Sequence, residues 1–240
     1  PDVRGIICSR GGYGSSRILS RIDYDGLAAD PKVIVGFSVI TAILNAVYAR
    51  TGLVCFHGPM MSGITSSSWS FNQLLLQISV RAKHPFRWSY PSDSDRPVNT
   101  FTGASKTVQG RTLGGCLSIL STLSGTPWCH SPADHILFME DVGEAPYRID
   151  RLLTHLINSG WFDETKGIIT GIFQGCAQKA SDTEPTPTVE DVLRERIHQS
   201  SLPWFSGLPF GHITDSLTIP IGVEILLSCD GVIQLESAVR

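Results

Sequence analysis

The segment PKVIVGFSVITAILNAVYAR, residues 31 to 50, joins an apolar strand to a helix at a single serine. The β-branched run at 32 to 35 indicates a buried strand, after which apolar residues recur at helical spacing. Ser38 therefore lies in a strand-to-helix turn. Gly36, two positions earlier, can adopt a strained backbone and leaves room for a neighbouring segment, as a turn that exposes a serine hydroxyl requires. The residues at helical spacing are Ile40, Leu44 and Val47.

Two interpretations of Ser38 remain open from this segment alone. A serine held between the end of a strand and the start of a helix is a candidate nucleophile. Serine is also among the most favourable N-cap residues, so the same side chain can serve only to begin the helix. The choice depends on which residues elsewhere in the chain accompany Ser38.

The composition is that of a globular protein without a strong electrostatic field. Of the 240 residues, 42% are hydrophobic and 17% are charged, which suits one large core or two smaller ones. A formal net charge of -3 provides no attraction for phosphate backbones or anionic lipid. Nucleic acid is therefore not expected among the partners.

No segment is typical of membrane insertion or export. No apolar run is long enough to span a bilayer, and the opening PDVRGIICSRGG lacks the basic and apolar regions of a signal peptide. These features predict a cytoplasmic protein with no membrane partner. The six cysteines include no CxxC pair, which argues against a zinc ribbon or a dithiol redox site and favours reduced thiols. They are Cys8, Cys55, Cys116, Cys129, Cys176 and Cys229.

Strands and helices alternate in the first part of the chain. Apolar segments at 3 to 8, 32 to 35 and 53 to 56 are separated by helical segments, which predicts parallel βαβ units. In such sheets, ligand sites collect beyond the carboxyl ends of the strands. The glycine spacing at 10 to 14 fits neither GxGxxG nor a P-loop, so a plain βα turn is favoured there over a nucleotide site. The loops at this edge are RGGYG at 10 to 14, GFSV at 36 to 39 and HGPM at 57 to 60.

A second domain is predicted in the remainder of the chain. Residues 84 to 106 are rich in Pro, Ser, Asp and Thr and are typical of a linker and substrate-facing loop. We therefore divide the chain into an amino-terminal domain, 1 to 100, and a carboxy-terminal domain, 101 to 240. In the second domain, strands are predicted at 108 to 115, 136 to 139, 167 to 173, 217 to 221 and 232 to 235, and helices at 116 to 123, 147 to 160 and 188 to 197. Thr188 and Asp191 are expected to cap the last of these helices. A loop is predicted at 177 to 188 and a turn at 208 to 212.

A nucleophilic serine needs a base and an orienting acid. Imidazole is the best-matched base at neutral pH, and His212 and His57 both follow strand or turn signals, so both stay open on these grounds. Glu140 and Glu144 are the candidate acids, with a solvated carboxylate as the alternative for either. Two further charged residues, Asp150 and Arg151, are expected to make helix-surface or ion-pair contacts.

Donors for a tetrahedral oxyanion are expected near the serine. The backbone amide of Val39 follows Ser38 at the helix start, and the glycine loop can bring the amide of Gly11 or Gly12 from the adjacent strand end. Arg10 is a candidate partner for a substrate carboxylate, with a structural ion pair as the alternative.

Five motifs occur in order along the chain and resemble the serine L,D-carboxypeptidase family. They are RGGYG at 10 to 14, PKVIVGFS at 31 to 38, HGPM at 57 to 60, EDVGEAPYRIDR at 140 to 151 and LPFGH at 208 to 212. The resemblance implies that Ser38 is the nucleophile, that Glu140 is the charge-relay acid and that His212 is the base. A triad is defined by geometry, so the distances between these residues in sequence are no obstacle.

The resemblance further implies an activity and an architecture. Family members hydrolyse the bond between the L-centre of a diamino acid and a terminal D-Ala of murein tetrapeptide, in peptidoglycan recycling, through an acyl-serine and without metal or other cofactor. They are typically homodimers. Each chain has an α/β amino-terminal domain with a parallel sheet, which supplies the serine, and a β-rich α/β carboxy-terminal domain, which supplies the Glu and the His.

Three departures from the family pattern affect the prediction. Strand and helix units that precede RGGYG in the family are not in this chain, so the first sheet is expected to have an unpaired edge. Val39 replaces the usual Asp, and Cys116 replaces the Asn of GGNL. Two alternatives therefore accompany the carboxypeptidase prediction: a related serine peptidase giving immunity to a microcin-type peptide-nucleotide, and a truncated, non-catalytic binder of peptidoglycan peptides.

Overall fold

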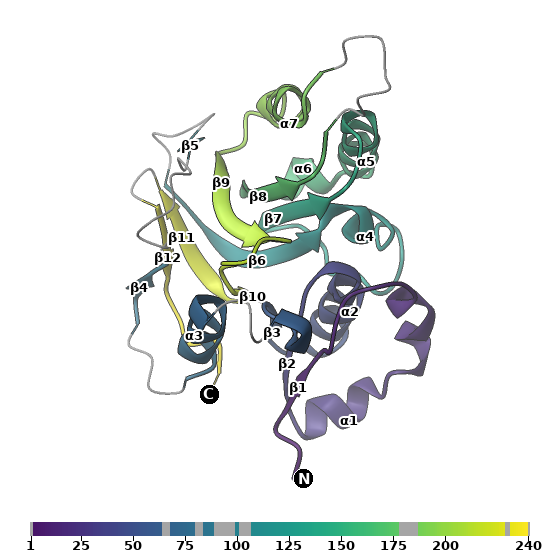
Figure 1. Cartoon of the computed structure of the whole chain (residues 1–240), viewed down its shortest axis with the longest axis vertical. Helices are drawn as coiled ribbons and strands as arrows, with labels where there is room; N and C mark the ends of the chain where they lie inside the picture. The colour runs from purple at the N-terminus through teal and green to yellow at the C-terminus, as the bar shows by residue number, and fades with distance from the viewer. Residues whose placement is uncertain are drawn as a thin grey trace.

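The structure of the chain is a computed structural model with two sheets, one below the other in Figure 1. It describes residues 2–63, 68–79, 84–88, 99–100, 107–177, 187–228 and 231–239. The predicted linker at 84–106, the predicted domain boundary near residue 101, the loop at 177–188 and Cys229 fall largely or wholly outside the described residues.

The first sheet has the strand order β1-β2-β3-β10. Strands β1 (Gly5–Ile7), β2 (Val33–Gly36) and β3 (Cys55–His57) are parallel, which confirms the predicted α/β sheet. Strand β10 (Ile219–Ile221) returns from late in the chain and pairs antiparallel with β3, with Ile219 opposite His57.

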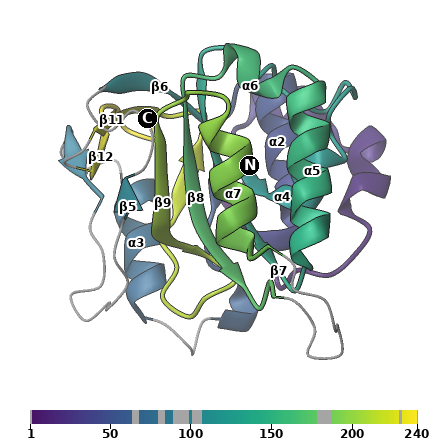
Figure 2. The ribbon, with the colours of Figure 1, turned by 90° about the horizontal axis from the view of Figure 1, so that it is seen from above.

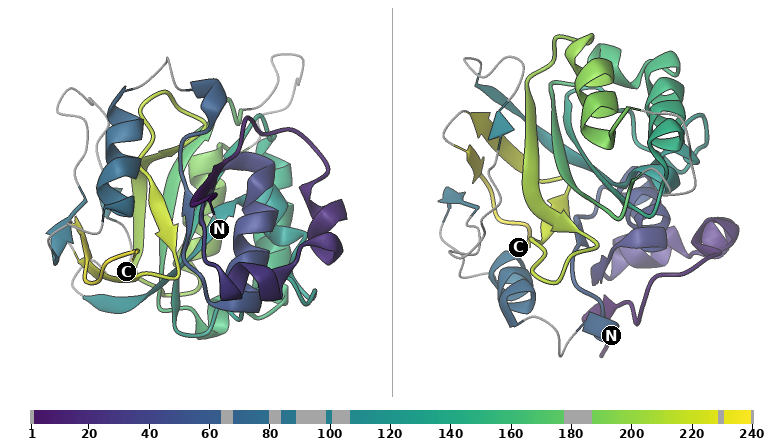
Figure 3. Two further views of the ribbon diagram at one scale, coloured as in Figure 1. Left: turned by 90° about the horizontal axis from the view of Figure 1, so that it is seen from below. Right: turned by 45° about the horizontal axis from the view of Figure 1, so that its top comes forward.

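Helices cover both faces of this first sheet, on opposite sides of it in Figure 3. Side chains of a strand point alternately to its two faces. Ile34 accordingly lies in one apolar cluster with Leu44 of α2 (Thr41–Thr51), and Val35 lies in another with Leu74 of α3 (Ser68–Ile78). The sheet that carries Ser38 is therefore held from both sides.

Strand β1 lies at the edge of the first sheet. Within the described residues it pairs with β2 alone. Ile6 and Ile7 are 45% and 41% exposed, so apolar side chains of an edge strand face solvent there.

The second sheet is strongly curled and has the order β4-β12-β11-β6-β7-β8-β9-β5. Its central strands β6 to β9 are parallel, and the strands outside them are antiparallel to their neighbours. The bounds are β4 (Phe86–Arg87), β5 (Asn99–Thr100), β6 (Val108–Cys116), β7 (His135–Val142), β8 (Gly167–Gln174), β9 (Trp204–Gly211), β11 (Glu224–Ser228) and β12 (Gly231–Gln234).

Helices pack on the outer face of the parallel strands. Figure 2 shows α5 (Pro146–Asn158) and α7 (Val189–His198) side by side there, with α4 (Leu117–Ser121) and α6 (Trp161–Glu164) beside them. Helix α7 begins with the predicted capping box, in which the side chains of Thr188 and Asp191 each accept a hydrogen bond from the other residue's backbone amide.

The remaining helical elements lie near the first sheet. They are η1 (Ser15–Arg21), α1 (Tyr24–Ala29), η2 (Ser38–Ile40) and η3 (Met61–Gly63). Within the described part of the chain, no helix combines the length and the apolar character needed to cross a bilayer.

The predicted turn at 208–212 is wrong, because Leu208–Gly211 belongs to β9. Proline and flanking glycines, present here as Pro209, Gly207 and Gly211, are typical of turns. The register between β8 and β9 jumps from Thr170 opposite Ser206 to Ile172 opposite Gly211, so Pro209 lies in a bulge. A bulge tolerates proline because its residues do not need to donate to the ladder. Strands β4, β5 and β11 and the short helix α6 were not predicted. The helical segment expected between the first two strands is formed by η1 and α1.

Candidate active site

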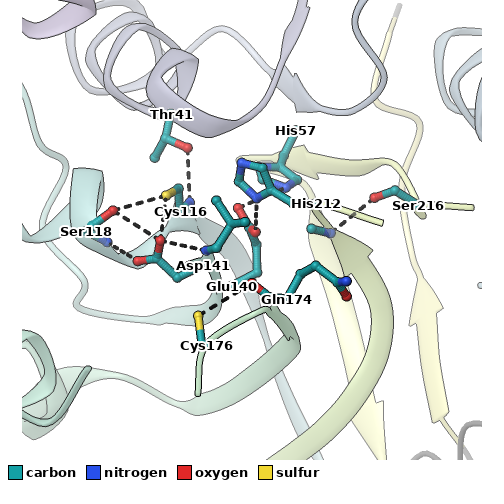
Figure 4. Close-up of polar contacts among 12 residues, drawn as sticks. Thr41, His57, Cys116, Ser118, Glu140, Asp141, Gln174, Cys176, His212 and Ser216 are labelled. Atoms are coloured by element: carbon teal, nitrogen blue, oxygen red, sulfur yellow. Dashed lines mark hydrogen bonds and ion pairs between the residues drawn. The ribbon is translucent and has the colours of Figure 1, made fainter. Parts of the chain in front are cut away.

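The three residues predicted to act together lie at the carboxyl ends of parallel strands. Ser38 begins η2, two residues after the end of β2. Glu140 lies near the end of β7, and His212 follows β9 directly. Figure 4 shows Glu140 and His212 together with the polar residues around them.

Ser38 has a strained backbone. Its φ angle is 61°, in the left-handed region that non-glycine residues rarely adopt. Gly36 permits this turn, because a Cβ there would lie 2.8 Å from Cγ2 of Ile40 and 3.2 Å from Cβ of Cys8. The N-caps of η2 and α2 are Phe37 and Ile40, so Ser38 does not cap either helix. Strain of this kind costs on the order of 1–3 kcal/mol and is typical of functional turns.

The glycine loop lies against the Ser38 hydroxyl. A Cβ on Gly11 would be 2.9 Å from Oγ of Ser38, so glycine is required for this approach. Backbone bonds hold the loop in place: the amide of Met61 donates to Cys8 O at 3.1 Å, and that of Ser62 donates to Ser9 O at 2.9 Å. The structure thus places the loop backbone next to the serine.

Arg10 and Val39 flank this arrangement. The Arg10 side chain is exposed and forms no ion pair with the described residues. Val39 buries its side chain in the core, at 7% exposure, while its amide belongs to the first turn of a helix, where backbone N–H groups have no carbonyl one turn earlier.

Glu140 and His212 form a short hydrogen bond. His212 Nδ1 lies 2.8 Å from Glu140 Oε2, and the carboxylate is fully buried. Burial raises the pKa of the Glu140 carboxyl, and the hydrogen bond from His212 opposes that rise. Gly211 makes the pairing possible, since it has φ 118° and a Cβ there would lie 2.8 Å from Glu140 Oε2.

His212 links this pair to the serine turn. Its ring packs edge-on against Phe37, the residue before Ser38, with centroids 4.9 Å apart. The His212 side chain is 18% exposed and borders a pocket of about 330 Å³. No hydrogen bond joins Ser38 Oγ to His212 in the described structure. The pocket is otherwise lined mainly by apolar and hydroxyl side chains, among them Phe37, Pro59, Met60, Ser70, Thr214 and Ser216.

His57, the rival base, is buried on the other side of Glu140. It is 1% exposed, and its Nε2 lies 4.0 Å from Glu140 Oε1. Burial lowers the pKa of His57 to about 3, with the charge of His212 adding to the effect. A buried imidazole of this kind is a weaker base than an ordinary histidine.

The neighbouring Asp141 has a different role from Glu140. Asp141 Oδ2 accepts a 2.7 Å hydrogen bond from the amide of Ser118, at the start of α4. Cys116 Sγ lies 3.5 Å from Asp141 Oδ1, and burial together with nearby carboxylates raises the pKa of the Cys116 thiol. The thiol therefore stays protonated at neutral pH.

Two hydrogen bonds join the helix after Ser38 to the second sheet. The amide of Cys116 donates to Thr41 Oγ1 at 3.0 Å, and Asn45 Nδ2 donates to Gly114 O at 2.9 Å. A Cβ on Gly115 would lie 2.6 Å from Thr41 Oγ1, so glycine is needed there too. Sequence reasoning missed this connection, although paired glycines at a strand end signal close backbone approach.

The other candidates lie elsewhere. Glu144 pairs with Arg148 at 3.3 Å on the exposed start of α5, and Asp150 pairs with Arg196, as expected for a helix-surface residue. Arg151 is exposed on the same helix. Among the described residues, no three His, Cys, Asp or Glu side chains gather as a metal site would require.

A larger cavity, of about 830 Å³, lies at the opposite ends of the strands. Its lining includes Val33 at the start of β2, together with Tyr48 and Arg111. Ligand sites of parallel sheets form at the carboxyl ends, so the smaller pocket beside His212 is the candidate active site.

Comparison with known proteins gives consistent matches along the chain. The LD-carboxypeptidase N-terminal domain profile matches residues 1–58, and the LD-carboxypeptidase C-terminal domain profile matches residues 109–227. A Streptomyces coelicolor protein named as a carboxypeptidase is 38% identical over 236 residues, which cover 96% of this chain and 70% of the relative.

Two further matches bear on chemistry. The murein tetrapeptide carboxypeptidase of Pseudomonas aeruginosa is 32% identical over 229 residues, which cover 95% of this chain and 73% of that protein. The solved structure of MccF in complex with glutamyl sulfamoyl guanosine superimposes with a TM-score of 0.87 at 25% identity, covering 100% of this chain and 78% of that chain.

Proposed function

Since the chain belongs to the LD-carboxypeptidase family, we propose that it is a serine hydrolase that releases terminal D-Ala from murein tetrapeptide. Ser38 is the nucleophile, His212 the general base and Glu140 the acid that orients His212. The observation that carries this proposal is the 2.8 Å bond between His212 Nδ1 and Glu140 Oε2, next to the strained Ser38 turn.

The proposed reaction has two halves. Ser38 Oγ attacks the scissile carbonyl carbon while its proton passes to His212 Nε2, and the C–N bond then breaks as His212 returns that proton to the leaving amine. A water attacks the resulting ester with His212 again taking the proton. The ester C–O bond breaks, Ser38 Oγ regains a proton, and the shortened peptide leaves.

Backbone amides serve the oxyanion. The amide of Val39 and that of Gly11 or Gly12 are the proposed donors, supported by the close approach of Gly11 to Ser38 Oγ. Arg10, which is exposed and forms no ion pair in the described structure, is proposed to bind the substrate's terminal carboxylate.

The substrate assignment rests on the relatives. Murein tetrapeptide is favoured by the Pseudomonas aeruginosa relative and by the EDVGEAPYRIDR motif. A peptide-nucleotide substrate is the second candidate, favoured by the similarity to MccF solved with a sulfamoyl guanosine compound. Non-catalytic binding of peptidoglycan peptides is the third. The proposal also includes action in the cytoplasm, a homodimer, and domains spanning 1–100 and 101–240.

Incubation with each substrate separates these candidates. We expect release of D-Ala from murein tetrapeptide and no cleavage of a peptide-nucleotide; the reverse result supports the second candidate. Binding of tetrapeptide without turnover supports the third. Ser38→Ala is expected to abolish release, and Ser159→Ala, on an exposed serine after α5, is the matched control. Retained release by Ser38→Ala rules out the nucleophile assignment.

A further inference from the structure

Glu140 is hydrogen bonded on one side only. Its Oε2 receives the bond from His212, but its Oε1 has no hydrogen-bond partner among the described residues, although the side chain is fully buried. A buried carboxylate oxygen without a donor is costly, because burial removes the hydrogen bonds that water would otherwise donate to it.

His57 has the complementary deficiency. Neither of its ring nitrogens has a hydrogen-bond partner in the described structure, and Nε2 is 4.0 Å from Glu140 Oε1. Because burial keeps His57 neutral, its ring carries one proton, which can reside on either nitrogen. The two unpartnered groups face each other, as Figure 4 shows.

The surroundings hold this imidazole in place and keep water out. Aromatic rings contact it on three sides: Phe37 at 6.0 Å, Phe138 at 5.5 Å and Phe210 at 6.1 Å between centroids. Phe37 also contacts His212, so the residue next to Ser38 touches both imidazoles. The ring of Phe37 therefore links the serine turn to both imidazoles.

We propose that His57 is a positioning residue that donates its Nε2–H to Glu140 Oε1 during catalysis. The inference rests on the proposed function, since it assigns a partner to the proposed acid. A closure of about 1 Å brings the two atoms to hydrogen-bond distance. The added bond keeps Glu140 ionised and fixed while His212 carries its proton.

The direction of the effect on pH dependence follows from charge. The N–H of His57 stabilises the Glu140 carboxylate most when His212 is neutral. Loss of this donor therefore favours the protonated form of the Glu140–His212 pair. The titratable groups facing Glu140 are His212, His57, Asp141 and Cys116. Of these, His57 can be replaced without removing a member of the proposed triad.

Three variants test the proposal. His57→Phe keeps an aromatic ring but removes the donor, and we expect kcat/KM to fall about 10- to 100-fold and its acidic limb to move to higher pH by about 0.5 to 1 unit. His57→Gln restores an N–H donor. It is expected to recover part of the lost kcat/KM and part of the shift of the acidic limb. The control His135→Phe replaces a second buried histidine, which lies in β7 and is bonded to Tyr48 and Ala133, and is expected to leave the limb in place.

An NMR measurement distinguishes failure of this inference from failure of the proposed function. In the wild-type protein, ring ¹⁵N shifts are expected to place the His57 proton on Nε2. A proton on Nδ1, or an acidic limb unchanged in His57→Phe, overturns the positioning role. Absence of turnover by the wild type, with the NMR result as expected, overturns the proposed function instead. If His57→Phe does not fold, the kinetics of His57→Gln and the wild-type ¹⁵N shifts still test the positioning role of His57.

Discussion

Thr41 Oγ1 accepts a 3.0 Å hydrogen bond from the backbone amide of Cys116, and this bond ties the helix after Ser38 to the sheet that carries Glu140. Thr41 is fully buried, three residues from the serine, and Cys116 ends β6 opposite Glu140 of β7. The distance between Ser38, the proposed nucleophile, and Glu140, the proposed acid, therefore depends on a contact between two separate sheets.

Removing that acceptor is expected to weaken both stability and activity. Thr41→Val keeps the shape of the side chain but leaves the Cys116 amide unpaired, which costs about 1–3 kcal/mol in the free energy of unfolding. Urea unfolding and kcat/KM on the tetrapeptide measure the two effects. Thr122→Val, on the exposed threonine that follows α4, is the control and should change neither appreciably. An unchanged kcat/KM in Thr41→Val contradicts the positioning argument.

Neutralising Glu140, the proposed orienting acid, is expected to remove most activity. Glu140→Gln retains the size of the side chain but presents an amide to His212 Nδ1, which disfavours the required tautomer, and kcat is expected to fall about 10³- to 10⁴-fold. Steady-state kinetics at saturating substrate measure the loss. Glu144→Gln removes only an exposed pairing with Arg148 and should stay near wild type. Equal effects in the two variants would show that Glu140 has no special role.

A side chain at Gly211 is expected to damage the site directly. Gly211→Ala meets a positive φ of 118° and places a Cβ 2.8 Å from Glu140 Oε2, so the bond to His212 must lengthen. Gly175→Ala provides a matched comparison, because Gly175 has φ 64° and a Cβ there would meet no atom within 4 Å. Both variants should lose about 1–2 kcal/mol of stability from backbone strain, but only Gly211→Ala should lose activity as well. Thermal unfolding and kcat/KM test this difference.

His57 is expected to make the protein sensitive to acid. Its pKa is lowered from an ordinary value of 6.5 to about 3, so its contribution to stability is complete above pH 6.5 and is lost as the pH falls towards 3. The corresponding free energy is on the order of 5 kcal/mol. Urea unfolding between pH 7 and pH 4 should therefore show a steeper loss for wild type than for His57→Phe. Parallel curves for the two proteins would show that His57 titrates normally in the fold.

Local patterns were sufficient to predict the strand and helix around Ser38. The β-branched run, Gly36 and the helical spacing act over a few residues, and the structure has β2 and α2 where they indicate. The capping box at Thr188 was predicted for the same reason. The turn predicted at 208 to 212 was wrong, because the local preference of Pro209 is the same in a turn as in the bulge of β9.

Long-range contacts could not be predicted in this way. The approach of Glu140 to His212 was inferred only from a family resemblance, since nothing local relates the end of β7 to the residue after β9. The bond between Thr41 and Cys116 and the unpaired nitrogens of His57 depend on how two sheets meet. Such features leave no periodic signal in the sequence.

The return of β10 to the first sheet has a consequence for the order of folding. Strand β3, which ends at His57, is flanked on one side by β2 and on the other by Ile219–Ile221. During synthesis, the sheet that carries Ser38 stays incomplete until most of the second sheet has already emerged. Contacts of such high sequence separation slow folding, so the serine turn is expected to reach its final form among the last parts of the molecule.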